Sequence, residues 1–227
     1  MNGQSNYEGR YRTMLERNDL LAMQALAPLS STYLPWSASA MRPSGVAVLN
    51  EIFVNRRRCV VELGSGVSTF FIARLLRQRG GHIWTVEHDE RWADLVGEEL
   101  ASEGLGDVVT VVHAPLTPIQ SEWPDEEASW YDQSCLKEMT AGAPVDLLIV
   151  DGPPAYEAGR EHARYPRGPL LRLNARRGLR RCPRRHRPAR RARHHGARWE
   201  HDLALTFERR PANGRIGIGR PGAAFIV

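Results

Sequence analysis

Short apolar runs alternate with helical patterns along most of this chain. Four runs have the length of a buried strand: Cys59 to Leu63, His82 to Glu87, Val108 to His113 and Val145 to Asp151. The last is nearly continuous in apolar residues, which is typical of a strand covered on both faces. Strands that alternate with helices predict a parallel sheet with right-handed crossovers, with ligands bound at the carboxyl ends of the strands.

Helical spacing of apolar residues marks the connecting segments. We expect helices over Pro43 to Asn55, over Ser68 to Arg79, and from the N-cap Asp89 through Ser102. A short helix is expected around Tyr11 to Leu26, and residues 1–42 are interpreted as a lead-in that serves as a substrate lid. Residues 43–227 then form one domain, since a chain of 227 residues is short for two.

The C-terminal pattern differs from the rest. Leu205 to Arg209 and Arg215 to Gly219 flank Pro-Ala-Asn-Gly, a turn sequence that joins antiparallel strands. The predicted fold class is therefore α/β, a Rossmann-like three-layer αβα sandwich whose mostly parallel sheet ends in a C-terminal antiparallel hairpin. A helix over Ala155 to Leu171 and a fifth strand near residues 180–187 complete this prediction.

Arginine dominates the place where the fifth strand is expected. Residues 162–199 contain 14 arginines and no acidic residue, so the rest of the chain has 17 basic against 26 acidic side chains. The sequence of residues 180–187, Arg-Arg-Cys-Pro-Arg-Arg-His-Arg, would bury unpaired charges inside a sheet. We therefore expect the fifth strand to be disrupted, with residues 172–198 aberrant.

Two explanations of this stretch stay open. The first is a basic insert that binds RNA, although it lacks interleaved aromatic residues, lysines and a recognisable module. The second, which we favour, is translation out of frame between two compensating shifts. Lys137 is the sole lysine among 31 basic residues, as GC-rich coding would give, and shifting the frame by one base allows Val-Leu-Val-Val-Ile-Asp from Cys182 to Arg187.

A glycine loop follows the first strand, in Glu62-Leu63-Gly64-Ser65-Gly66. Glycines allow a sharp turn and a close approach to a ligand, and the next helix offers N–H groups to it. Thr69 stands where a dinucleotide motif has its third glycine, and no phosphate-binding Gly-Lys-Ser/Thr sequence follows. Glu87, at the end of the second strand, suits the two hydroxyls of a ribose, a feature shared by NAD and S-adenosylmethionine binders.

Four segments resemble the ordered motifs of class I S-adenosylmethionine-dependent methyltransferases: Val-Val-Glu-Leu-Gly-Ser-Gly, Thr-Val-Glu-His-Asp, Val-Val-His-Ala-Pro-Leu and Val-Asp-Leu-Leu-Ile-Val-Asp-Gly-Pro-Pro. The resemblance implies S-adenosylmethionine as cofactor. It implies a methionine end lined by the loop and the following helix start, a ribose on Glu87, and an adenine between the ends of the second and third strands. The residues so implied are Glu62, Gly64, Ser65, Gly66, Ser68, Thr69, Glu87, His88, His113 and Ala114.

Asp151 ends the fourth strand, where this family keeps residues that face the transferred methyl group. In the catechol-type O-methyltransferases an aspartate here helps to bind magnesium, but a lone aspartate is no metal site, and Asp151 equally suits a turn cap. Magnesium is thus an implied option without a full ligand set. Trp36 and the segment Trp130 to Asp132 are candidates for walls of a substrate pocket, or for packing.

The expected function is S-adenosylmethionine-dependent methylation, most simply O-methylation of a small molecule. An NAD-type oxidoreductase and an inactive or RNA-binding Rossmann-like protein are the alternatives. Three cysteines without a metal-ligand spacing, and no apolar run long enough to span a bilayer, predict a cytoplasmic protein without a membrane or nucleic-acid partner. The expected partner is a small-molecule methyl acceptor.

Overall fold

The protein was analysed as a computed structural model. It describes residues 2–30, 34, 40–54, 57–119, 128–139, 145–155, 180–183, 205–210 and 216–221. Trp36 and nearly all of the helix expected over Ala155 to Leu171 lie outside these residues, as does most of the aberrant segment 172–198.

A seven-stranded sheet forms the centre of the molecule, in the order β3-β2-β1-β6-β7-β9-β8. The first five strands in this order are parallel, and β9 is antiparallel to both of its neighbours. This confirms the predicted Rossmann-like α/β fold and its C-terminal antiparallel hairpin. The strands are β1 (Cys59–Leu63), β2 (His82–Glu87), β3 (Val109–His113), β6 (Leu147–Val150), β7 (Arg180–Pro183), β8 (Leu205–Arg210) and β9 (Ile216–Pro221).

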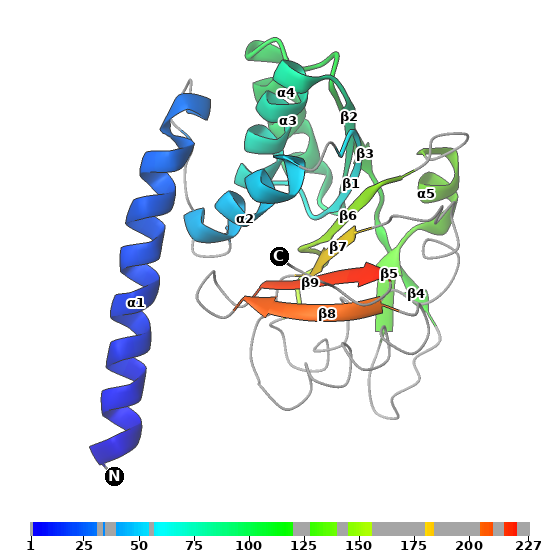
Figure 1. Cartoon of the computed structure of the whole chain (residues 1–227). Coiled ribbons are helices and arrows are strands. Elements are labelled where there is room, and N and C mark those ends of the chain that lie inside the picture. The colour runs from blue at the N-terminus through cyan, green and yellow to red at the C-terminus, as the bar shows by residue number, and fades with distance from the viewer. Residues whose placement is uncertain are drawn as a thin grey trace.

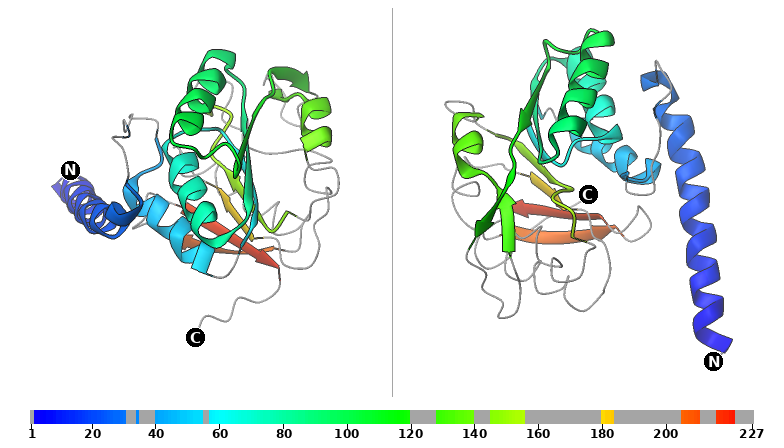
Figure 2. Two further views of the ribbon diagram at one scale, coloured as in Figure 1. Left: turned by 90° about the horizontal axis from the view of Figure 1, so that it is seen from above. Right: turned by 180° about the vertical axis from the view of Figure 1, so that it is seen from behind.

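Three helices cover one face of the sheet: α2 (Pro43–Val54), α3 (Val67–Arg79) and α4 (Glu90–Ser102). Figures 1 and 2 show them together on that side of the sheet, with β4, β5 and α5 on the other side. All three were predicted to within two residues at each end, because their apolar residues recur at helical spacing. On α4, however, Ala93, Val96 and Leu100 are buried, whereas Trp92 is 42% exposed.

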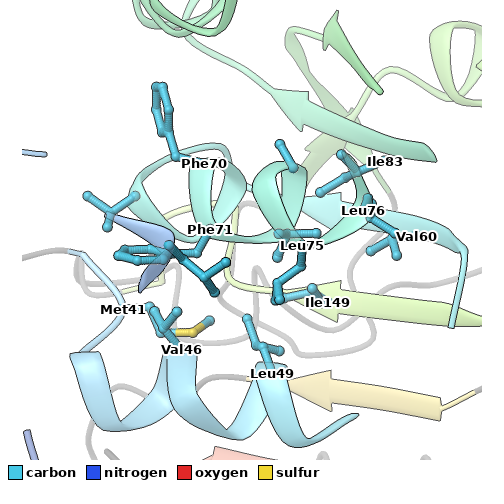
Figure 3. Close-up of a cluster of buried hydrophobic side chains, with 14 of the residues drawn as sticks. Met41, Val46, Leu49, Val60, Phe70, Phe71, Leu75, Leu76, Ile83 and Ile149 are labelled. Atoms are coloured by element: carbon cyan, nitrogen blue, oxygen red, sulfur yellow. The ribbon is translucent and has the colours of Figure 1, made fainter. Parts of the chain in front are cut away.

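The side chains of β1 alternate between two apolar clusters. Val60 lies in the cluster under α2 and α3, where Figure 3 shows it with Phe71, Leu76 and other residues of these elements. Val61 and Leu63 belong to the cluster on the opposite face. Because successive strand residues point to opposite faces, Glu62 shares the α3 side with Val60.

A small insertion between β3 and β6 was not predicted. It consists of the antiparallel pair β4 (Leu116–Ile119) and β5 (Ala128–Tyr131), followed by α5 (Gln133–Met139). Trp130, Tyr131 and Leu136 from this insertion are buried against β1 and β6 in the second cluster. The insertion therefore covers the face opposite α3, where a helix would lie in a simple strand-helix alternation (Figure 1).

The expectation that the arginine-rich stretch disrupts the fifth strand is wrong for residues 180–183. β7 runs parallel to β6, with partners from Leu147↔Arg180 to Val150↔Pro183, and Arg181 pairs with Gly219 of β9. Sheet pairing uses backbone N–H and C=O groups, which side-chain charge does not remove. The strand is only four residues long, half of the range expected near residues 180–187.

The N-terminal helix is longer than predicted. α1 (Asn2–Leu26) extends along the outside of the domain beside α2 and is followed by the short 3-10 helix η1 (Ala27–Leu29) (Figures 1 and 2). Asp19 fixes it, since one carboxylate oxygen accepts hydrogen bonds from the Ser44 backbone N–H at 3.1 Å and from its hydroxyl at 2.7 Å, and the other pairs with Arg42. A carboxylate from α1 thus caps the start of α2. Among the described residues, no helix has the length and apolarity needed to cross a membrane.

Candidate functional site

The predicted site residues meet at the carboxyl ends of β1, β2, β3 and β6, which are neighbours in the sheet. The β1 end is followed by the glycine loop, whose Gly64 N–H donates to the backbone carbonyl of Val86 in β2 at 2.8 Å. At the next strand pair, Glu87 and His113 are register partners. Parallel pairing therefore brings residues that are distant in sequence to a single edge, as the strand-end rule for such sheets predicts.

Glu62 lies beneath the loop and is completely buried. Its Oε1 accepts a hydrogen bond from the Ser68 hydroxyl at 2.6 Å. Its Oε2 accepts from the hydroxyls of Thr69 at 2.6 Å and Thr85 at 3.0 Å. Thr85 is its register partner on β2. The carboxyl group of Glu62 therefore ties the start of α3 to both strands.

Burial raises the pKa of Glu62 to about 7, and the charge of Asp151 adds to this rise, although the three hydroxyl hydrogen bonds act in the opposite direction. Both protonation states are accessible near neutral pH. A hydroxyl can donate or accept, so Ser68, Thr69 and Thr85 are able to serve the charged and the neutral carboxyl group.

Thr69 explains why this loop works without the third glycine of a dinucleotide motif. Its hydroxyl oxygen accepts a hydrogen bond from the Gly66 backbone N–H at 3.0 Å while it donates to Glu62. The loop is thereby joined to the buried carboxyl group through one side chain. A Cβ atom added at Gly66 would meet nothing within 4 Å, so the loop presents open space at this position.

Gly64 and Gly152 permit a close contact between the ends of β1 and β6. Gly64 has φ +92°, and a Cβ there would lie 2.9 Å from the Gly152 backbone nitrogen. The backbone N–H groups of Asp151 and Gly152 both donate to the Leu63 carbonyl, at 2.9 and 2.6 Å. Any side chain at Gly64 would therefore combine an unfavourable φ with a collision against the backbone.

Glu87 ends β2 with both carboxylate oxygens engaged. Oε2 accepts from the Ser65 backbone N–H at 3.2 Å and from the Ser65 hydroxyl at 3.1 Å. Oε1 accepts from the backbone N–H groups of His88 at 2.7 Å and Asp89 at 3.0 Å, and lies 2.6 Å from Nδ1 of His88. The carboxylate is only 4% exposed and connects the glycine loop with the start of α4.

The pKa of Glu87 is lowered. Burial alone would raise it, but hydrogen bonds from the His88 side chain and from backbone N–H groups, together with the charge of His88, outweigh burial. Three of these donors are backbone N–H groups, which have no accepting capacity. Glu87 therefore stays ionised, as an acceptor for ribose hydroxyls must be.

The residues predicted for the adenine side lie around Glu87. His88 is half-buried beside it, and His113 is exposed at the end of β3. Ala114 is fully buried, and its backbone N–H donates to the Glu87 carbonyl at 2.8 Å. The structure thus brings His88, His113 and Ala114 to adjacent strand ends.

Asp151 stands at the end of β6, close enough to Glu62 for its charge to act on that group. In the described parts of the chain, no three His, Cys, Asp or Glu residues lie together as a group able to hold a metal ion. The described residues therefore supply no full ligand set for magnesium around Asp151.

Sequence reasoning missed two contacts at the site. Trp92 of α4 donates from Nε1 to the Ser65 carbonyl at 3.1 Å. Tyr131 is completely buried, and its ring meets the His88 ring edge-on at 6.4 Å between centroids. The neighbouring Trp130 is buried, and its ring centroid lies 5.2 Å from that of Tyr131. These contacts support a packing role for Trp130 rather than a place in a pocket wall. The only signal for these contacts in the sequence was the polar group that each of these aromatic side chains carries close to a strand end.

Comparisons with known proteins agree with this arrangement. Residues 61–165 match a family model described as a methyltransferase domain. No match is found among curated proteins. Similar folds occur in solved structures of a Podospora anserina methyltransferase with bound S-adenosylhomocysteine, a Staphylococcus aureus protein provisionally assigned as a caffeoyl-CoA O-methyltransferase, and a Geobacter sulfurreducens methyltransferase.

These three similarities extend over nearly the whole fold at low sequence identity. The Podospora structure has a TM-score of 0.54 and 12% identity, with 98% of this chain and 97% of that chain covered. The Staphylococcus structure has a TM-score of 0.53 and 10% identity, with 88% and 90% covered. The Geobacter structure has a TM-score of 0.50 and 14% identity, with 88% of each chain covered.

The fold, the strand-end residues and the family match lead to the same result. The resemblance drawn from the four sequence motifs is confirmed, and S-adenosylmethionine is the cofactor that the site residues suit. Residues 61–165 match the methyltransferase-domain family, and the chain has the Rossmann-like fold that the similar methyltransferase structures share.

Proposed function

We propose that the protein transfers a methyl group from S-adenosylmethionine to a hydroxyl group of a small molecule. The observation that carries this proposal is Glu87, an ionised and buried carboxylate at the end of β2, linked directly to the glycine loop through Ser65. A ribose needs such an acceptor, and a loop with open space at Gly66 leaves room for the rest of the cofactor.

The cofactor residues divide into two groups in this proposal. Gly64, Ser65, Gly66 and the start of α3 bind the methionine end, while Glu87, His88, His113 and Ala114 bind the ribose and adenine. We assign Glu62 to positioning rather than to direct cofactor contact, because it is completely buried beneath the glycine loop, where its oxygens are bonded to Ser68, Thr69 and Thr85. When bound, S-adenosylmethionine supplies an electrophilic methyl group on its sulfonium.

Asp151 is the proposed acid-base residue. It lies at the end of β6, next to Gly152, which contacts Gly64 of the cofactor loop. From there its carboxylate accepts the proton of the acceptor hydroxyl as the new carbon–oxygen bond forms. Most of the rate acceleration then comes from holding the two reactants in line.

The choice of a hydroxyl acceptor has support from two sides. A carboxylate base suits the deprotonation of a hydroxyl, and the Staphylococcus aureus structure of similar fold is assigned to O-methylation. We infer a small molecule as the acceptor, in keeping with the methyltransferase domain at residues 61–165.

We also propose that residues 1–42 serve as a substrate lid on the domain formed by residues 43–227. The capping of α2 by Asp19 gives this segment a defined attachment to the domain. The variant Asp19→Ala is expected to raise the KM for the acceptor while leaving the affinity for S-adenosylhomocysteine unchanged. An unchanged KM would contradict the lid role.

For residues 172–198 we propose translation out of frame. Support comes from the composition, 14 arginines without an acid over residues 162–199, in the part of the chain that leads into and out of β7. Resequencing codons 165–200 tests this directly. An unchanged reading frame, together with the matching mass of the expressed protein, would refute it.

The methyl-transfer proposal is tested by mass-spectrometric detection of S-adenosylhomocysteine and methylated product with a panel of phenols and aliphatic alcohols. We expect turnover with at least one acceptor. The turnover rate should be lower by about 100-fold or more in Asp151→Asn. Asp94→Asn, an equivalent change at an exposed position of α4, is the matched control. Turnover that is equal in all three proteins would exclude Asp151 as the base.

A further inference from the structure

Tyr131 occupies a position that links four strand ends. It is the last residue of β5 and pairs with Leu116, while the following Asp132 N–H donates to the Pro115 carbonyl at 2.9 Å. This fixes the tyrosine next to the loop that leaves β3 at Ala114. Its side chain is completely buried, although it ends in a polar hydroxyl group.

One contact of Tyr131 faces the adenine side of the site. Its ring meets the imidazole of His88 edge-on, with 6.4 Å between the centroids and 76° between the planes. His88 in turn contacts the Glu87 carboxylate. The ring of Tyr131 therefore supports the residue that borders the proposed ribose acceptor.

The other contact faces the methyl-transfer side. A Cβ atom built on Gly152 would lie 2.2 Å from the Tyr131 hydroxyl oxygen, which places that oxygen directly against the Gly152 backbone. Gly152 in turn lies against Gly64, since the same Cβ atom would be 2.9 Å from the Gly64 Cα. The Tyr131 hydroxyl therefore packs directly against the segment that carries Asp151.

We propose that Tyr131 is a positioning residue that sets the place of the Asp151–Gly152 segment relative to the cofactor pocket. This inference rests on the proposed methyl transfer. The ring spans from His88 at the end of β2 to Gly152 at the end of β6, and β1 with Gly64 lies between these strands in the sheet. A single rigid side chain thereby connects the cofactor side of the reaction to the acceptor side.

The energetic reason is the strict geometry of in-line transfer. A displacement of about 1 Å in a reacting group costs on the order of 100-fold in rate, even when its cause lies outside the reacting atoms. Tyr131→Phe keeps the ring against His88 and removes only the oxygen that abuts Gly152. The substitution should therefore affect the methyl-transfer step and leave cofactor binding largely intact.

The test compares kcat with cofactor affinity in Tyr131→Phe. We expect kcat to fall about tenfold or more, and the Kd for S-adenosylhomocysteine, measured by calorimetry, to change by less than about threefold. Leu95→Ala, at a position 55% exposed on α4 and outside the proposed lid and cofactor residues, is the control and should leave both values unchanged. A Tyr131→Phe enzyme with lower thermal stability but wild-type kcat would overturn the proposal, as would a change in Kd without one in kcat.

A double-mutant cycle with Gly152→Ala examines the contact itself. The added methyl group collides with the Tyr131 hydroxyl at 2.2 Å and with the Gly64 backbone at 2.9 Å. Tyr131→Phe relieves the first collision. The loss of kcat and of unfolding free energy in the double variant should therefore be smaller than the sum of the losses in the two single variants. Independent effects in both kcat and the free energy of unfolding would contradict the contact.

Different results would refute the proposed methyl transfer and the proposed role of Tyr131. A folded wild-type protein without turnover on any acceptor would refute the proposed function. In that case the cycle measured in the free energy of unfolding still decides the Tyr131–Gly152 contact, because it needs no activity. Turnover in the wild type combined with an unaltered Tyr131→Phe would refute only the role of Tyr131.

Discussion

Two buried glutamates at adjacent strand ends, Glu62 on β1 and Glu87 on β2, have opposite electrostatic behaviour. Burial raises the pKa of Glu62 to about 7. Burial acts on Glu87 in the same direction, yet hydrogen bonds and the charge of His88 lower its pKa. Burial alone therefore does not determine the charge of a carboxyl group at this edge of the sheet.

The difference lies in the donors. Glu62 is surrounded by three hydroxyl groups, which can donate to a carboxylate or rearrange around a neutral acid. Glu87 receives backbone N–H groups from Ser65, His88 and Asp89, which can only donate. The first arrangement suits a structural anchor under the loop, and the second suits a permanently charged acceptor for a ligand.

The largest expected effect comes from Glu87→Gln, which places an amide NH2 against backbone N–H groups that only donate. Because each hydrogen bond to a charged group contributes about 1.5–3 kcal/mol, the affinity for S-adenosylhomocysteine should fall about 10- to 100-fold. Isothermal titration calorimetry measures this, with Glu90→Gln on the exposed side of α4 as the control. Equal affinity in the two variants would remove Glu87 from the cofactor site.

Thr69→Val should have the next largest effect. It removes the hydroxyl that accepts from the Gly66 N–H and donates to Glu62, while keeping the size of the side chain. We expect the affinity for S-adenosylhomocysteine to fall about fivefold to tenfold, in line with the loss of one or two hydrogen bonds. Thr69→Ser retains the hydroxyl and should stay near wild type. A normal affinity for Thr69→Val would show that the loop is held by other contacts.

Glu62→Gln should reduce affinity less than Glu87→Gln, because hydroxyl groups can serve an amide. Its clearest signature is pH dependence. The folded pKa of Glu62, about 7, lies above its ordinary value of 4.5, so its protonated form stabilises the fold fully below pH 4.5. That contribution is lost as pH rises through about 7. The free energy of unfolding of the wild type should therefore decline relative to Glu62→Gln over this interval.

The same experiment on Glu87 sharpens the contrast. Its lowered pKa contributes stability that is present above pH 4.5 and is lost as pH falls below that value. The free energy of unfolding, measured with urea between pH 3.5 and 8, should hence change with pH in two separate ranges. Glu62→Gln should abolish the change in one range, and Glu87→Gln the change in the other. A single range common to both variants would show that the two carboxyl groups titrate as a coupled pair.

The smallest effect is expected for Trp92→Phe. The indole N–H donates to the Ser65 carbonyl, but the side chain is 42% exposed, so water can replace this hydrogen bond. The affinity for S-adenosylhomocysteine should change by about twofold at most. A loss as large as that of Glu87→Gln would mean that the tryptophan itself is part of the cofactor site.

The sequence predicted the half of the domain in which periodicity and turn chemistry agree. β1 and β2 were bounded correctly, and Asp89 caps α4 through the Trp92 N–H at 2.9 Å. Glu62 and Glu87 were singled out because they lie at the carboxyl ends of β1 and β2, and Thr69 because it stands where a dinucleotide motif has its third glycine. Their internal hydrogen bonds were not predictable, since they depend on the register between β1 and β2.

Other features depend on contacts that no local pattern encodes. The β4–β5 pair and α5 are short, and Tyr131 acquires its place only when the insertion folds over β1 and β6. β7 forms from arginines, because its backbone pairs with Leu147 to Val150 regardless of composition. The length of α1 was underestimated because its first turns are polar in sequence.

The most direct test of the account is calorimetric titration of the full chain with S-adenosylmethionine, S-adenosylhomocysteine and NAD. We predict that the two S-adenosyl compounds bind with one-to-one stoichiometry, that NAD gives no heat, and that Glu87→Gln weakens both interactions. Binding of NAD alone, or no heat from either S-adenosyl compound with a folded protein, would contradict a cofactor site at the ends of β1 and β2.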